Sequence, residues 1–263
     1  MVNRVCSSKQ LRRWVKIEKE NIIFKTVKQN VTAEIVEKKS RFIAHIFYVE
    51  SAEEADSYIK QIKKKYNDAR HNCFAYAIET GDGGIAVKYN DDGEPQGTAG
   101  APMLKLVLEQ GLSNILVIVT RYFGGVLLGT GGLVRAYSGA VEEALKNSEI
   151  IQKARGYEAK IQIDYNYLEP LKYYLEKMNI RIVKIEYLEK IEIVIELLKE
   201  FTEKITNNYE NENFKISKFD IIKEKFVEIW SKNSKIGKKF KKTLALLVKT
   251  YYNAKCKYFT IIF

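Results

Sequence analysis

The sequence predicts a two-domain protein: an α/β first domain, an α+β ferredoxin-like second domain, and a basic tail. Three observations predict it. Strand-like and helix-like stretches alternate through residues 31–147, and thirteen of the fifteen glycines lie between Gly81 and Gly139. After Gly156, the order β-α-β-β-α-β fits into about 60 residues, which is the ferredoxin-like motif. We place the domains at 23–150 and 151–217, the basic extensions at 1–22 and 218–263, and the linker at 148–156.

The first domain opens with an alternating, strand-like stretch over residues 31–50. A helix is predicted over 52–66, because Ser51 and Glu54 form a capping box and an apolar stripe follows them. The stretch ILVIVT is β-branched and apolar throughout, which predicts a central strand at 115–120. The remaining elements are strands at 72–78 and 85–89, a helix from near Pro102 to Gly111, and a helix at 133–147.

The second domain shows a strand over 157–165 with alternating apolar residues, and a helix over 168–178. The pattern then predicts strands at 180–187 and 191–197, a helix near 198–207 and a strand near 214–217. Beyond residue 217, apolar residues recur at helical spacing: Phe219, Ile222, Phe226, Ile229 and Trp230. A lysine run, KIGKKFKK, follows at 235–242.

The formal net charge of +11 suggests an acidic partner such as nucleic acid. The charge lies at the two ends of the chain. Residues 1–30 carry a net +6 and residues 218–263 a net +9, so residues 31–217 carry a net −4. A second interpretation stays open: the chain is rich in Lys, Ile, Asn and Tyr throughout, and its basicity can follow from that composition alone.

The sparse cysteines and histidines argue against a disulfide framework and a structural zinc site. Cys6, Cys73 and Cys256 lie far apart, and the histidines, His45 and His71, lack zinc-ligand spacing. We therefore expect no metal and no cofactor. Because no run of about 18 apolar residues occurs and the N-terminus lacks the apolar core of a signal peptide, we expect no membrane span and a cytoplasmic protein.

The glycine-rich stretch after the predicted central strand is a candidate anion site. Arg121, Tyr122 and Phe123 leave that strand, Gly124 and Gly125 follow, and the loop ends at a helix N-terminus. Backbone N–H groups and the helix dipole favour an anion there, Arg121 could hold a phosphate, and Tyr122 or Phe123 could stack on a base. The alternative is a tight structural turn in which Arg121 pairs with a carboxylate. A triphosphate loop is disfavoured, because Thr130 stands where the loop's lysine belongs.

Two further clusters are candidate sites. His71 and Cys73 are two apart on a predicted strand and so share a face, which makes a Cys–His nucleophile conceivable and a packing role more ordinary. Asp91, Asp92 and Glu94 lie close enough in sequence to bind a divalent cation, but they lack the length of a calcium loop. A solvated acidic turn is the favoured interpretation of these three residues.

Four stretches in order resemble the YigZ/IMPACT family: KKSRFIAHI (38–46), DARHNCFAY (68–76), DDGEPQGTAGAPML (91–104) and RYFGGVLLGTGGLVRAYSGA (121–140). The resemblance implies a first domain similar to domain IV of elongation factor G and to a domain of ribosomal protein S five. It implies a ferredoxin-like second domain similar to domain V of elongation factor G. Eukaryotic members of the family are translation regulators, and RNA or ribosome binding is the usual suggestion for bacterial members.

The resulting expectation is a non-enzymatic, translation-linked protein that binds RNA or the ribosome. The alternatives are a protein-interaction module acting on a translation or stress-response partner and, less favoured, a hydrolase that uses Cys73 and His71. The expected nucleic-acid-binding residues are Lys39, Arg41, Arg121, Tyr122, Phe123, Gly124, Gly125, Arg135, Lys238, Lys239, Lys241 and Lys242.

Overall fold

The computed structural model describes residues 23–81, 83–206 and 214–229. These residues form two compact units. The first ends within one long strand at Glu158 and also includes Leu198–Thr202 and Ile221–Glu228, and the second begins at Ala159. The domain boundaries drawn from the sequence stay predictions. The N-terminal extension (1–22) and the lysine run with Lys238, Lys239, Lys241 and Lys242 lie outside the described residues.

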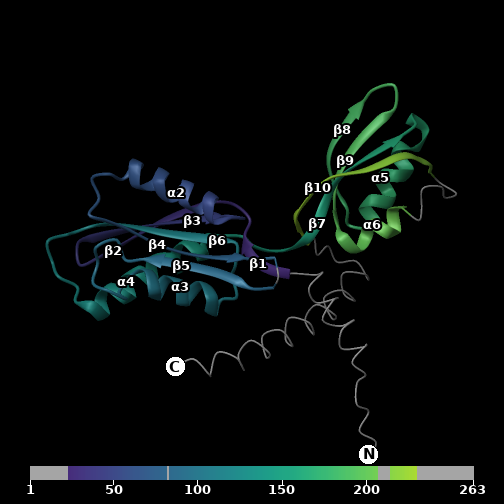
Figure 1. The fold of residues 1–263 in the computed structure, drawn as a ribbon. Coiled ribbons are helices and arrows are strands. Elements are labelled where there is room, and N and C mark those ends of the chain that lie inside the picture. Colours follow the sequence, from purple (N-terminus) through teal and green to yellow (C-terminus); the bar gives the residue numbers. More distant parts are fainter. Residues whose placement is uncertain (1–22, 82, 207–213, 230–263) are drawn as a thin grey trace, which may run out of the picture. The chain divides into compact units, whose positions relative to one another are not determined.

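The first unit is built on a five-stranded antiparallel sheet (Figure 1). Its order is β2 (Val31–Glu37), β3 (Ser40–Tyr48), β6 (Ile115–Tyr122), β4 (His71–Glu79) and β5 (Ile85–Asn90). The strand predicted to be central, β6, lies in the middle and is buried from Ile115 to Arg121. Both of its neighbours run antiparallel to it, so segments distant in sequence meet at its end.

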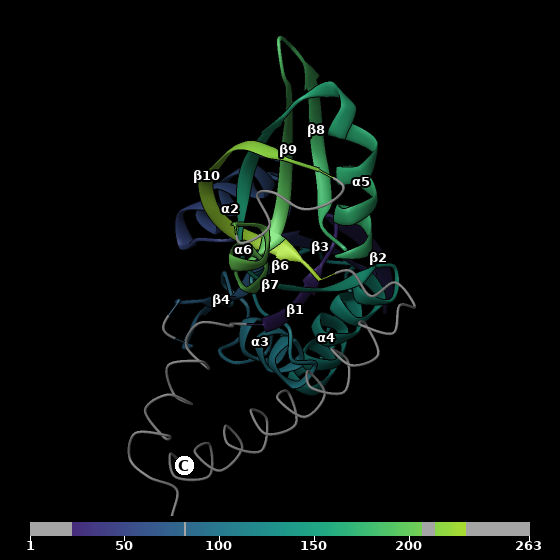
Figure 2. The ribbon, with the colours of Figure 1, turned by 90° about the vertical axis from the view of Figure 1, so that its right-hand side faces the viewer.

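Helices cover both faces of this sheet. Helix α2 (Ala52–Lys65) lies on one face, while α3 (Gly100–Glu109) and α4 (Thr130–Lys146) lie side by side on the other (Figures 1 and 2). Side chains alternate along each strand, so neighbouring residues serve different cores. On β6, Leu116 and Ile118 pack toward α2, whereas Val117 and Val119 pack toward α3 and α4.

The predicted helix starts are confirmed for α2 and shifted for the other two. The Glu54 N–H donates to Ser51 Oγ at 3.2 Å, and the Glu54 carboxylate accepts from the Glu50 N–H rather than from that of Ser51. Helix α3 starts at Gly100, so Pro102 is its third residue rather than its first. Helix α4 starts at Thr130, three residues before the predicted start, because the glycine-rich stretch itself supplies the first turn.

The predicted linker at 148–156 is wrong, because residues 150–163 form one continuous strand, β7 (Ile150–Ile163). Its first residues pair antiparallel with β1 (Ile23–Val27), a strand that we did not predict. Val27 and Thr26 of β1 are fully buried, and so β1 is an integral part of the first unit.

The second unit confirms the ferredoxin-like order of elements. The chain runs from β7 through η1 (Tyr165–Tyr167), α5 (Leu168–Lys177), β8 (Arg181–Tyr187), β9 (Ile191–Leu198) and α6 (Lys199–Thr206) to β10 (Ile216–Glu228). Strand β7 pairs with β9 and with β10, and β8 lies beyond β9. Alternate residues of β9 are buried, and α5 runs alongside β8 (Figure 2).

The helical spacing predicted after residue 217 is wrong as far as residue 228. Residues 216–228 form β10, a 13-residue strand, so Phe219, Ile222 and Phe226 lie in a sheet. The residues assigned to a basic extension from position 218 therefore belong in part to the fold.

Candidate functional site

A strained two-lysine turn stands at one end of the first sheet. Glu37 pairs with Ser40 in the β2–β3 ladder, so Lys38 and Lys39 alone make the connection. Their φ angles are 45° and 65°, the pattern of a type I′ turn, which normally contains Asn-Gly. A left-handed backbone costs a residue with a Cβ about 1–2 kcal/mol. Both lysine side chains are exposed, so packing does not explain their presence.

Gly124, two residues beyond the end of β6, supports this turn. Its N–H donates to Ser40 Oγ at 3.1 Å, and a Cβ added to Gly124 would lie 2.0 Å from the carbonyl carbon of Lys39. The two backbones approach so closely that any side chain at position 124 is excluded. The backbone that lies closest to Gly124 is thus that of the protein's own turn.

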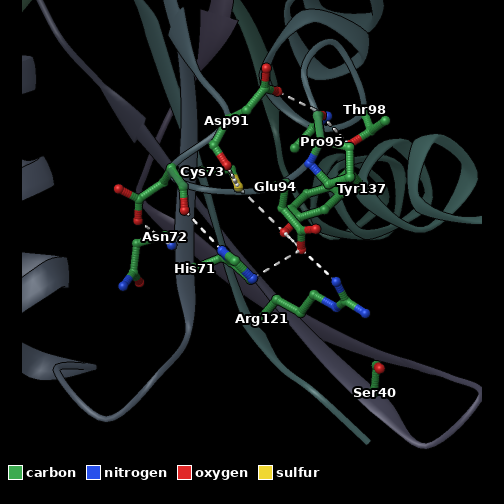
Figure 3. Close-up of polar contacts among 12 residues, drawn as sticks. Ser40, His71, Asn72, Cys73, Asp91, Glu94, Pro95, Thr98, Arg121 and Tyr137 are labelled. Atoms are coloured by element: carbon green, nitrogen blue, oxygen red, sulfur yellow. Dashed lines mark hydrogen bonds and ion pairs between the residues drawn. The ribbon is translucent and has the colours of Figure 1, made fainter. Parts of the chain in front are cut away.

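Arg121 lies beneath this end of the sheet in a buried ion pair. Its Nη1 donates to Glu94 Oε1 at 2.5 Å, and Arg121 and Glu94 are only 6% and 9% exposed. Figure 3 shows Arg121, His71 and Tyr137 pointing toward the Glu94 carboxylate. Arg121 Nε is buried and has no hydrogen-bond partner among the described residues. This is the predicted alternative, an arginine paired to a carboxylate, and it corrects the expectation of an accessible phosphate ligand.

The other groups around Glu94 are also engaged within the fold. The Tyr137 hydroxyl donates to Glu94 Oε1 at 2.9 Å, and His71 Nε2 lies 3.8 Å from the same oxygen. His71 Nδ1 lies 2.8 Å from the Asp92 carbonyl oxygen. The Cys73 thiol donates to the Asp91 carbonyl at 2.9 Å, and burial raises its pKa to about 12. A thiol with that pKa stays protonated near neutral pH and is a poor nucleophile.

The acidic stretch before α3 is held by its own carboxylates. Asp91 accepts from the backbone N–H groups of Gly97, Ala99 and Gly100, at 2.9, 3.1 and 2.7 Å, and so caps the start of α3. Asp92 accepts from Lys63 Nζ at 2.6 Å and from the Asn72 N–H at 2.8 Å. With Glu94 buried, the favoured interpretation of a solvated acidic turn is wrong.

Arg41 and Tyr122 lie on the α2 face of the same sheet end, opposite each other in the ladder. Arg41 forms a two-pronged pair with Glu34, with distances of 2.8 and 2.9 Å, and its guanidinium carbon lies 5.5 Å from the Tyr122 ring centroid. The Tyr122 hydroxyl donates to Asp68 at 2.8 Å. The fork of Arg41 and the hydroxyl of Tyr122 therefore already have protein partners.

Among the residues that the structure describes, the exposed cations without an ion pair overlap only in part with the predicted set, and they also include Lys60 and Lys64 of α2. Within the described ranges, Lys38, Lys39, Arg70 and Arg135 are exposed and have no ion pair. Arg70 directly precedes β4, whose first residue opposes Arg121, so it lies at the same end of the sheet. Arg135 Nη1 lies 3.7 Å from the position of a Cβ at Gly131, in the first turn of α4. We call these four residues the basic rim.

Exposed apolar side chains follow β6 next to the basic rim. Phe123 is 42% exposed, Val126 41% and Leu127 82%, and Gly125 and Gly129 adopt φ angles of 81° and 73°. Helix α4 has no side-chain cap, so the first N–H groups of Thr130 and the residues after it are not bound by a capping side chain.

The described residues contain no group of three or more His, Cys, Asp or Glu side chains placed to hold a metal ion. In the same part of the chain, no helix combines the length and the apolar character needed to cross a bilayer.

The structure therefore brings Lys39, Arg41, Tyr122, Phe123, Gly124 and Gly125 to one sheet end, and places Arg121 beneath them and Arg135 on α4. Sequence reasoning missed Lys38 and Arg70 as rim residues and Glu94 as the partner of Arg121. Lys38 is the first residue of the first family-like stretch, KKSRFIAHI. Two adjacent lysines do not by themselves predict a turn.

Two family models match the chain: the Impact N-terminal domain over residues 38–145, and a domain of unknown function, DUF1949, over residues 161–209. The IMPACT family member YvyE of Bacillus subtilis is 41% identical over 167 residues, which cover 64% of this chain and 76% of YvyE. The chain belongs to the IMPACT family. YigZ of Escherichia coli, another member, is 37% identical over 150 residues, covering 57% of this chain and 74% of YigZ.

A crystal structure of a hypothetical protein has a similar fold, with a TM-score of 0.50 and 29% identity. The match covers 80% of this chain and 98% of the chain of that protein. The first matched family model spans the whole basic rim, the acidic stretch and the buried Arg121–Glu94 pair. The site thus lies inside the portion of the chain that the family model describes.

Proposed function

We propose that this IMPACT family chain is a non-enzymatic, translation-linked protein that binds RNA or the ribosome through the basic rim. The observation that carries the proposal is that Lys38, Lys39, Arg70 and Arg135 have no ion pair within the described ranges. Exposed, unpaired cations gathered at one end of a domain attract phosphate groups and release counterions when they bind them. The link to translation comes from the family resemblance.

The buried groups support a role without catalysis. Arg121, Glu94 and Tyr137 are bound to one another, and the Cys73 thiol is held by the Asp91 carbonyl with its pKa raised to about 12. His71 is directed at Asp92 and Glu94 rather than at Cys73. A Cys–His nucleophile requires the imidazole to take the thiol proton, and these contacts do not provide that geometry.

The charges of the second unit offer a weaker surface for RNA. Lys160 pairs with Glu192 at 2.8 Å and Arg181 pairs with Glu196 at 3.3 Å, across neighbouring strands of its sheet. Cations that already face carboxylates gain less from a phosphate than unpaired ones. The proposal therefore places the main contact on the first unit.

The test is a salt series of RNA binding with the full chain. We expect the double variant Arg70→Gln/Arg135→Gln to bind a ribosomal RNA fragment more weakly and with a flatter dependence on salt. Each lost phosphate contact lowers the slope of log affinity against log salt by about 0.7–0.9. Lys146→Gln is the matched control, because Lys146 lies at the other end of α4, about 24 Å from Thr130 at 1.5 Å per residue. If the double variant and the control bind alike, the basic rim does not bind RNA.

A protein partner is the second candidate, and the exposed side chains of Val126 and Leu127 favour it. Exposed aliphatic side chains on a short loop contribute to protein interfaces and contribute little to phosphate recognition. Leu127→Ser separates the two functions. It should leave RNA affinity unchanged, and it should weaken ribosome co-sedimentation only if a ribosomal protein is the contact.

A further inference from the structure

We infer that the basic rim recognises single-stranded RNA, with phosphates on the Lys38–Lys39 turn and an unpaired base stacked on Phe123. This inference rests on the proposed function and narrows it from RNA in general to single-stranded RNA, whose bases are unpaired.

The backbone of the turn is the first ground for the inference. Lys38 and Lys39 occupy left-handed positions for which Asn-Gly is the favoured pair. The Lys-Lys turn is therefore less stable than an Asn-Gly turn would be at the same place. Strained backbone persists where the surrounding structure over-determines it, and it concentrates at functional sites. Here the Gly124 backbone provides that support. Neither lysine has an ion pair within the described ranges, so the fold itself makes no use of their charges.

The charges near the turn leave it cationic. Glu37 is exposed next to Lys38, and Glu34 is occupied by Arg41 in the two-pronged pair. The turn therefore has two lysine charges and one adjacent carboxylate that is not in an ion pair within the described ranges. Because the backbone of the turn is already fixed, little backbone freedom is lost when the two lysines bind phosphate.

The Phe123 ring is the second ground. Its side chain is 42% exposed, and the Arg121 guanidinium carbon lies 5.6 Å from its centroid and 5.4 Å from that of Phe42. Arg121 is itself held by Glu94, so a fixed cation stands against the Phe123 ring while much of that ring stays in water. Exposed aromatic rings beside cations form the platforms on which single-stranded bases stack. Arg121 is thus a positioning residue for Phe123.

The spacing connects the two grounds. Arg41 opposes Tyr122, so continuing the ladder places Ser40 opposite Phe123 and Lys39 opposite Gly124. The contact of Gly124 with Lys39 and Ser40 agrees with that register. The Cα atoms of directly opposed residues are about 4.5–5.5 Å apart. The turn and the ring can therefore contact the phosphate and the base of neighbouring nucleotides. A duplex presents phosphates to the lysines but keeps its bases stacked inside.

The experiment measures binding of the full chain to a fluorescein-labelled oligouridylate strand, and to the same strand annealed to oligoadenylate. The variant Lys38→Asn/Lys39→Gly installs the favoured turn and removes both charges. We expect its Tm to rise by about 2–8 °C while its affinity for the single strand falls and its salt slope drops by about 1.4. Lys38→Arg/Lys39→Arg keeps the charges and should keep the affinity.

The second arm addresses the ring. Phe123→Leu should weaken single-strand binding by about fivefold or more and leave duplex binding unchanged, whereas Phe123→Tyr should bind as the wild type does. The inference is overturned if the Asn-Gly variant or Phe123→Leu binds the single strand as tightly as the wild type. If Arg70→Gln/Arg135→Gln still weakens RNA binding in that case, the proposed function stands alone. If the wild type binds neither RNA and does not co-sediment with ribosomes, both are overturned.

Discussion

Arg121 and Glu94 form a buried ion pair, with Arg121 Nη1 donating to Glu94 Oε1 at 2.5 Å. The pair joins the end of the central strand β6 to the acidic stretch before α3. Tyr137 of α4 donates to the same carboxylate oxygen, so one carboxylate connects three elements of the first unit.

Arg121→Ala should destabilise the first unit strongly. Removing one partner of a buried pair leaves the other charge uncompensated, which costs about 3–5 kcal/mol of the free energy of unfolding. Urea unfolding followed by circular dichroism measures this loss. The matched control is Arg41→Ala, which breaks the exposed pair with Glu34 and should cost about 0–1 kcal/mol. Equal losses in the two variants would contradict the burial of the Arg121–Glu94 pair.

Gly124→Ala should lower the Tm more than Gly125→Ala does. Gly125 has a φ of 81° and open space where a methyl group would lie, so alanine there meets only the left-handed backbone penalty of about 1–2 kcal/mol. At Gly124 the methyl group would lie 2.0 Å from the carbonyl carbon of Lys39, so a backbone must move. Thermal melts compare the two variants, and a higher Tm for Gly124→Ala would refute the close approach.

Asp91→Ala should loosen the start of α3. The carboxylate accepts three backbone N–H groups there, and loss of a capping acceptor costs about 0.5–2 kcal/mol. Hydrogen exchange of the Gly97, Ala99 and Gly100 amides should accelerate in this variant. Asp56→Ala is the control, since Asp56 is half-buried and its contact with Lys88 is long, at 3.7 Å. Unchanged exchange at all three amides would rule out the capping role.

His45 should make stability fall in mild acid. Burial, and then the charge of Lys65, lower its pKa from 6.5 to about 4, so it stays neutral in the folded chain while the unfolded chain takes up a proton. The stabilising contribution is complete above pH 6.5 and is lost as the pH falls from about 6.5 to about 4. Thr32 Oγ1 bonds Nδ1, the Tyr66 ring lies against the imidazole, and Nε2 has no partner within the described ranges.

Urea unfolding of the wild type and of His45→Gln at a series of pH values isolates this effect, because glutamine does not titrate in this range. The difference in unfolding free energy between the two proteins should shrink toward the acid end of the series. A difference that stays constant from pH 7 to pH 4 would show that another group is responsible for the acid sensitivity.

Sequence reasoning predicted those elements whose signals are local. The capping box of Ser51 and Glu54, the apolar run of β6 and the β-α-β-β-α-β order each depend on near neighbours in the chain. The turn at Lys38–Lys39 was missed, because its backbone is imposed by the register of β2 with β3 and by Gly124 rather than by its own residue types. The helical spacing from Phe219 failed for a similar reason, since pairing with β7 overrides it.

The candidate site was predicted only in outline. The glycine-rich stretch and its arginine were found, but whether Arg121 faces water or a carboxylate depends on the loop that delivers Glu94, 27 positions earlier in the chain. Arg70 was overlooked because its place at this end of the sheet follows from the antiparallel pairing of β4 with β6. Neither relationship has a signature within a short window of sequence.

The hydrogen bond between Gly124 and Ser40 spans 84 positions of the chain. During synthesis, the hairpin that contains Lys38 and Lys39 emerges long before β6, the strand that supports it. Such distant pairings slow folding because a long loop must close before they form. The nascent chain therefore carries an exposed, incomplete lysine turn until residue 124 has left the ribosome, and only then can the backbone support of the turn form.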